Sequence, residues 1–121
     1  FYTNTKAGLA LAQRILARFS CDNKQIIMIT DGKPSAITHE GQIIRHSWWD
    51  PWIIHETLRE AEKCRNKGIR INTFMLARDR LLVEFVHKQT QITRGKAYFT
   101  SPHTLGQYLL VDYMNQRRKR N

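Results

Sequence analysis

A carboxylate that directly follows an apolar run, at Thr30-Asp31-Gly32, is the first sign of chemistry in this sequence. The run 25–30 predicts a strand that is buried on both faces, as in a parallel sheet covered by helices. A carboxylate at the end of such a strand costs free energy unless a cation, hydrogen-bond donors or water satisfies it. Because Asp-Gly is also a common turn dipeptide, a simple turn at Asp31-Gly32 is the competing interpretation.

Thr3 supplies a second oxygen that is expected near Asp31. It precedes the first predicted helix, whose start should lie at the same edge of the sheet as the end of the strand 25–30. Hydroxyl and carboxylate oxygens suit a hard divalent cation, with waters completing the octahedron. The pair therefore predicts a metal site at the carboxyl edge of the sheet.

The elements that must position these residues follow from the apolar periodicity. Leu9, Ala12, Leu16 and Phe19, for example, form the stripe of an amphipathic helix. Helices are predicted over 5–19, 51–67 and 80–94 and from 102 onward, strands over 25–30, 69–76 and 96–99, and a long connection over 33–53. This alternation predicts an α/β fold with a three-layer parallel sheet and helices on both faces, in which ligands bind at the carboxyl ends of the strands.

The amino-acid composition limits the classes of protein to which this sequence can belong. The 121 residues are 41% hydrophobic and 25% charged, which fits one globular domain. No apolar run approaches the length of a membrane helix, and residues 1–4 do not resemble a signal peptide, so a cytoplasmic protein is expected. Cys21 and Cys64 lie in unrelated contexts and are expected to be idle or buried thiols.

Two motifs in this order resemble the von Willebrand factor type A (vWA) domain. They are Thr3-Asn4-Thr5 before a helix and Ile26-Ile27-Met28-Ile29-Thr30-Asp31-Gly32, and the later segments GIRINTFML and GKAYFTSPHTL resemble subsequent parts of that fold. The resemblance covers essentially 1–121 and implies a Rossmann-like sheet. It also implies a metal-ion-dependent adhesion site for Mg²⁺ or Mn²⁺, with Thr3 and Asp31 as ligands, whose open position takes a partner's carboxylate.

One family motif has no counterpart here. The D-x-S-x-S motif, which supplies an aspartate and two serine hydroxyls, occurs nowhere in the sequence. The chain therefore resembles a partial domain that lacks the N-terminal strands, and weak or absent metal binding by this chain alone is expected. The strand 26–30 would then be an exposed apolar edge, which predicts self-association or exchange of elements between chains.

The segment RHSWWDPW contributes three tryptophans to the connection that follows the metal edge. Tryptophan is enriched in binding hot spots, so Trp48, Trp49 and Trp52 are candidate partner-binding residues. The competing interpretation is that they fill the interior of a long loop or cover the start of the following helix.

The predicted function is a protein-interaction module rather than an enzyme. The sequence has no H-E-x-x-H, no G-x-S-x-G and no glycine-rich phosphate loop. Asp31-Gly32 superficially matches aspartate phosphoryl-transfer enzymes, but Thr30 replaces the second acid that they require. The chain resembles the bacterial-type intracellular members of the family, several of which resemble the chelatase-type subunit that works with an AAA+ ATPase, so such an ATPase is the expected partner by analogy.

A basic nucleic-acid-binding protein is the alternative function. The net charge is +10, and counterion release would favour binding to phosphates. The densest cluster lies in 117–121, which is predicted to be a flexible tail. The candidate contacts are Arg117, Arg118, Lys119 and Arg120, together with Arg65, Lys67 and Arg70.

Overall fold

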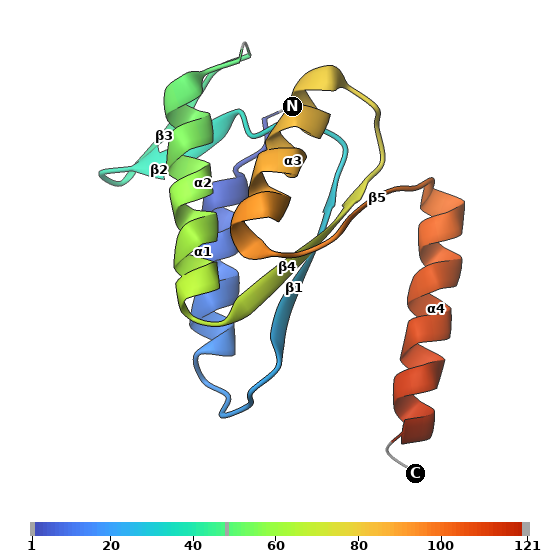
Figure 1. Cartoon of the computed structure of the whole chain (residues 1–121). Helices are drawn as coiled ribbons and strands as arrows, with labels where there is room; N and C mark the ends of the chain where they lie inside the picture. The colour runs from blue at the N-terminus through green and yellow to red at the C-terminus, as the bar shows by residue number, and fades with distance from the viewer. Residues whose placement is uncertain (1, 48, 120–121) are drawn as a thin grey trace.

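The computed structural model describes residues 2–47 and 49–119, with the side chains of all of these except 108, 112, 113 and 116–119. Nine elements follow one another along these ranges (Figure 1). They are α1 (Thr5–Leu16), β1 (Lys24–Thr30), β2 (Ala36–His39), β3 (Gln42–Arg45), α2 (Pro51–Asn66), β4 (Ile69–Met75), α3 (Arg80–Thr93), β5 (Ala97–Phe99) and α4 (Pro102–Lys119).

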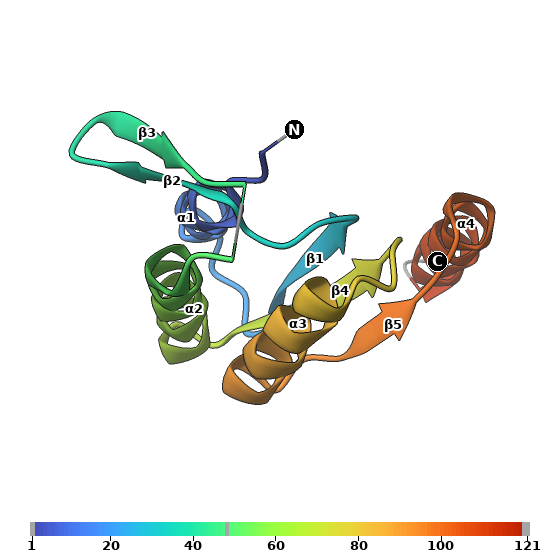
Figure 2. The same ribbon diagram turned by 90° about the horizontal axis from the view of Figure 1, so that it is seen from above.

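A parallel sheet with the strand order β1-β4-β5 forms the centre of the fold. The view from above shows α1, α2 and α3 on one side of this sheet and α4 on the other (Figure 2). Residues from α1, α2 and β4 form one core cluster, and residues from α2, β4 and α3 form a second. The predicted α/β class with a parallel sheet flanked by helices is therefore confirmed.

The prediction that the first strand is buried on both faces is wrong. Along β1, half-buried and exposed residues alternate, and Ile27 and Ile29 are 40% and 45% exposed. Only one face of β1 packs, with Ile26 and Met28 against the core cluster beneath α1 and α2. The other face stays open because α4 begins beyond β5 and its own apolar side chains Leu110 and Val111 remain exposed.

The prediction of a long connection over 33–53 is also wrong, because β2 and β3 form an antiparallel hairpin within it. The two-residue turn Glu40-Gly41 has φ of 52° and 78°, the left-handed conformation that favours tight hairpins. Ile37 is fully buried, whereas Ile43 is 68% exposed. The hairpin therefore packs through β2 onto α1 and α2.

Helix boundaries follow the capping signals in the sequence. The side chains of Asn4, Asp50 and Asp79 cap α1, α2 and α3, respectively. Gly68, with a φ of +74°, lies just after the end of α2. The predicted helix 80–94 ends one residue earlier in the structure, because Arg94 is the left-handed cap that follows α3.

The apolar side chains that recur along α2 and α3 are buried where these helices pack on the sheet. Ala61 and Cys64 of α2 are buried, as are Leu82, Phe85 and Val86 of α3. Burial raises the pKa of the Cys64 thiol to about 11, so this cysteine is an uncharged core residue. The stripe of the first helix extends too far, because Phe19 lies beyond α1 and is 59% exposed.

The basic C-terminal segment begins inside a helix. The backbone of α4 is helical through Lys119, so residues 117–119 of the predicted flexible tail continue this helix. Arg120 and Asn121 lie outside the described residues. Leu105, near the start of α4, is buried at 7% exposure.

Gly95 allows the chain after α3 to pass directly over β4. A Cβ atom at this position would lie 1.6 Å from the carbonyl oxygen of Ile71. We expect Gly95→Ala to lower the free energy of unfolding by about 1–3 kcal/mol, the usual cost of overpacking, measured by urea denaturation.

Gly8→Ala is the matched control for this substitution. A Cβ at Gly8 meets nothing within 4 Å, and Gly8 lies inside α1, so alanine should raise the free energy of unfolding by about 0.5–1 kcal/mol. Equal stability of Gly95→Ala and the wild type would contradict the close approach.

Candidate functional site

Thr3 and the turn after β1 lie at the same edge of the sheet. The backbone N–H of Thr3 donates to Ser35 Oγ at 2.9 Å, and its carbonyl accepts from the N–H groups of Ser35 and Ala36 at 2.9 and 3.1 Å. A side chain at position 32 would begin 3.8 Å from Thr3 Oγ1. The hydroxyl of Thr3 therefore faces the backbone immediately after Asp31.

The parallel register brings this turn to the carboxyl edge. Thr30 pairs with Met75, and the N–H of Leu76 donates to the Thr30 carbonyl at 2.8 Å. Asp31 is the first residue after β1 and is exposed. The Thr30 hydroxyl donates to the Gly32 carbonyl at 2.8 Å, so it is engaged in closing the local turn.

Two oxygen ligands are chemically suitable for a hard cation, but they are too few to complete its coordination shell. Asp31 and Thr3 are the two residues that the sequence assigned to the metal, and Mg²⁺ requires an octahedron of oxygens. Among the residues that the structure describes, no group of three or more His, Cys, Asp or Glu is placed to hold a metal ion. A metal site at Thr3 and Asp31 therefore stays a prediction.

Ser35 is a residue of this edge that the sequence analysis missed. It is only 6% exposed, and its hydroxyl holds the backbone of Thr3 from the start of the hairpin. The signal was present in the pattern of β2 and β3 around Glu40-Gly41, because a hairpin there would have brought Ser35 back to the start of α1. Ser35 is a positioning residue for Thr3.

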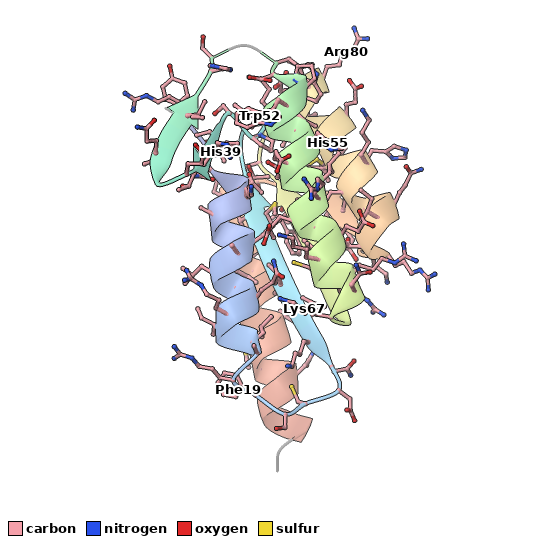
Figure 3. All side chains as sticks on the ribbon, turned by 90° about the vertical axis from the view of Figure 1, so that its left-hand side faces the viewer. Phe19, His39, Trp52, His55, Lys67 and Arg80 are labelled. Carbon is pink, nitrogen blue, oxygen red and sulfur yellow. The ribbon has the colours of Figure 1, made fainter. Side chains whose placement is uncertain are left out.

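The tryptophans of RHSWWDPW separate into different environments. Trp49 is half-buried and packs against the core cluster of α2, β4 and α3. Trp52 is 37% exposed, and its ring lies edge-to-face with His39 at a centroid distance of 5.3 Å (Figure 3). Trp48 lies outside the described residues. Trp49 therefore has the packing role of the competing interpretation, whereas partner binding by Trp48 and Trp52 stays a prediction.

Asp50 fixes the start of α2 beside these rings. Its carboxylate accepts from the N–H of Trp52 at 2.9 Å and contacts Nδ1 of His46. Burial raises the pKa of Asp50, but the hydrogen bonds from His46 and Trp52 and the charge of His46 outweigh it, so the pKa lies below its ordinary value. This stabilisation is present above the ordinary carboxyl range and is lost as the pH falls through the lowered pKa.

The alternative nucleic-acid site does not form one described surface. Arg117, Arg118 and Lys119 belong to α4 by their backbone, but their side chains and Arg120 lie outside the described part of the chain. Arg65, Lys67 and Arg70 are exposed around the end of α2 and the start of β4. This alternative stays a prediction without support from the fold.

Comparison with known proteins identifies the family. The family described as "Rv0959-like protein, vWA domain" matches residues 1–114. The chain belongs to this vWA family. Membership confirms the predicted resemblance to the vWA domain, and it supports a protein-interaction module in general terms.

The relatives of this vWA domain are longer proteins. The chain is 26% identical over 122 residues to the uncharacterized protein Rv0959 of Mycobacterium tuberculosis (strain ATCC 25618 / H37Rv) and to the uncharacterized protein Mb0984 of Mycobacterium bovis. These matches cover 97% of this chain and 18% of each relative. The chain thus spans less than a fifth of the length of the curated relatives that it matches.

Within residues 2–47 and 49–119, no helix combines the length and the apolarity that crossing a bilayer demands.

The incomplete ligand set generates a prediction about metal affinity. Calorimetric titration of the 121-residue chain with Mg²⁺ or Mn²⁺ should give a dissociation constant of about 1 mM or weaker, because a strongly hydrated ion needs more protein oxygens than Thr3 and Asp31 supply. Micromolar binding that persists in Asp31→Ala would contradict this assignment. Asp22→Ala, which removes an exposed carboxylate outside the edge, is the control.

Proposed function

We propose that this vWA domain is a non-enzymatic protein-interaction module whose partner docks at the edge formed by Thr3 and Asp31. The observation that carries the proposal is the placement of Thr3 Oγ1 against the turn 31–32 at the carboxyl ends of the strands. Hydroxyl and carboxylate oxygens at such an edge are suitable ligands for Mg²⁺ or Mn²⁺. When bound, the ion would supply an open coordination position for a carboxylate of the partner.

The remaining oxygens of the metal site are proposed to come from outside this chain. The relatives extend far beyond the matched region, so a longer polypeptide can provide a D-x-S-x-S segment. Asp31 is exposed and the backbone of Thr3 is fixed by Ser35. The backbone of Thr3 is therefore held in position, and Asp31 is accessible to further ligands.

An AAA+ ATPase is the proposed class of partner. The support is analogy with chelatase-type vWA subunits, which the sequence motifs resemble. Trp52 at the start of α2 is 37% exposed and is proposed as a further contact for such a partner.

A second copy of the chain is the proposed occupant of the free edge of β1. A groove of about 330 Å³ lies between this strand and α1, lined by Leu9, Ala12 and Ile26 to Thr30 among others. Unpaired strand edges with apolar side chains favour pairing with another chain. Two copies related by a two-fold axis would pair β1 with β1 antiparallel and join their sheets.

Loss of the Asp31 carboxylate tests partner docking. In the protein as it is naturally expressed, Asp31→Ala should weaken the Mg²⁺-dependent capture of a purified AAA+ ATPase by about tenfold or more, measured by surface plasmon resonance. Asp22→Ala should bind as the wild type does. Capture that is equal with Mg²⁺ and with a chelator, and equal in both variants, would overturn the metal-bridged interaction.

Charge on the open face of β1 tests self-association. The double variant Ile27→Lys with Ile29→Lys should shift the 121-residue chain from dimer to monomer in light scattering at micromolar concentration, because lysine protects strand edges from pairing. Ile43→Lys changes an isoleucine that is 68% exposed on the hairpin and should leave the dimer intact. A wild-type chain that is monomeric under these conditions would refute the proposal.

A further inference from the structure

A basic groove runs between α1 and α2 on the side of these helices that faces the viewer in Figure 3. Its volume is about 530 Å³. The residues that line it are Lys6, Ala7, Ala10, Gln13 and Arg14 of α1, Thr38 of β2, and Glu60, Lys63 and Lys67 at α2. Four cations and one carboxylate are thus gathered along two adjacent helices.

A buried polar contact fixes the floor of this groove. Gln13 is 3% exposed, and its Nε2 donates to the Leu9 carbonyl at 3.3 Å and to Glu60 Oε1 at 2.8 Å. Glu60 is 7% exposed, and its Oε2 lies 3.3 Å from Lys63 Nζ. This contact locks the spacing of the helices and satisfies the only acidic group in the lining.

The cations at the rim are only partly neutralised. Lys6 pairs with Glu56 at 3.4 Å, whereas Arg14 and Lys67 form no ion pair among the side chains that the structure describes. Both lie toward the C-terminal ends of their helices. The groove therefore presents uncompensated positive charge at the end farthest from the hairpin.

The spacing of the cations fits carboxylates on an extended peptide. Lys63 and Lys67 are one turn apart, about 6 Å along the helix, and alternate residues of an extended chain are about 6.6 Å apart. Lys6 and Arg14 are two turns apart, about 12 Å, which accommodates about four extended residues. Ala7 and Ala10 leave room for the peptide backbone between the helices.

A single-stranded nucleic acid fits the same groove less well. Binding of bases without sequence preference uses aromatic platforms, and none of the nine lining residues is aromatic. The lack of an aromatic platform therefore favours a peptide over a single-stranded nucleic acid.

We propose that the α1–α2 groove binds an acidic peptide segment in extended conformation, through Arg14 and Lys67 together with Lys63. This site is distinct from the edge at Asp31 and needs no divalent ion. It gives the module a second contact, with a partner that carries alternating acidic residues. The side chains that bind come from helices whose packing is already fixed by Gln13 and Glu60.

Fluorescence anisotropy tests this site with a labelled peptide of about twelve residues, in which Glu and Thr alternate. The 121-residue chain should bind it at low salt, and a peptide with Gln in place of Glu should not bind. Arg14→Glu with Lys67→Glu should weaken binding by about tenfold or more. Arg65→Glu with Arg80→Glu makes the same change in net charge at exposed positions outside the groove and should weaken it by less than about threefold.

Further measurements distinguish peptide binding in the groove from binding at the Asp31 edge and from nucleic-acid binding. Asp31→Ala and the addition of a chelator should leave the peptide affinity unchanged, because the groove is independent of the edge. Equal losses in the two charge-reversal variants would overturn the proposal, as would tighter binding of an oligothymidylate with the same sensitivity to Arg14 and Lys67. If circular dichroism shows that the groove variant is unfolded, Arg14→Gln with Lys67→Gln replaces it, and retention of wild-type affinity by that variant would also refute the site.

Discussion

The parallel pairing of β1 with β4 is the constraint on which the rest of the structure depends. The register runs without interruption from Lys24 opposite Ile69 to Thr30 opposite Met75, and one more hydrogen bond joins Leu76 to the Thr30 carbonyl. Because the pairing continues to the last residue of β1, Asp31 emerges directly at the carboxyl edge. A slip in this register would move the acid and would also exchange the packed and open faces of β1.

The same pairing leaves one edge and one face of β1 open. β1 has a single strand neighbour in the described sheet, and only its face with Ile26 and Met28 packs beneath the helices. The candidate ligand Asp31 directly follows this strand, on which Ile27 and Ile29 are uncovered. The candidate edge and the open face of β1 are therefore adjacent in the fold.

The edge at Thr3 and Asp31 and the α1–α2 groove are built from different kinds of structural element. The edge is built from turns, where the backbone of Thr3 donates to the Ser35 hydroxyl and accepts from the Ser35 N–H. The groove is built from helix sides, where the buried contact between Gln13 and Glu60 sets the spacing of α1 and α2. A partner could engage each surface by a different force, a hard-ligand interaction at the edge and charge attraction in the groove.

Local sequence signals were sufficient to locate helix ends, where a single residue decides the backbone conformation. The N-caps at Asp50 and Asp79 and the glycine after α2 are examples. The alternation of helices and strands along the sequence was sufficient to predict the parallel sheet. The two motifs around Thr3 and Asp31 could likewise be recognised from the sequence, because parallel strands bring their carboxyl ends to one edge. The sequence by itself thus determined the class of fold, the family and the location of the candidate site.

The burial or exposure of particular side chains was decided by tertiary packing, because it depends on which surfaces meet. Burial of β1 on one face, the exposure of Phe19 and the division between Trp49 and Trp52 depend on neighbours that no local pattern names. The hairpin formed because Ile37 could bury against α1 and α2, which Glu40-Gly41 alone did not reveal. The basic groove is the clearest case, since Arg14 and Lys67 are far apart in the chain and gain a shared surface only when two helices pack.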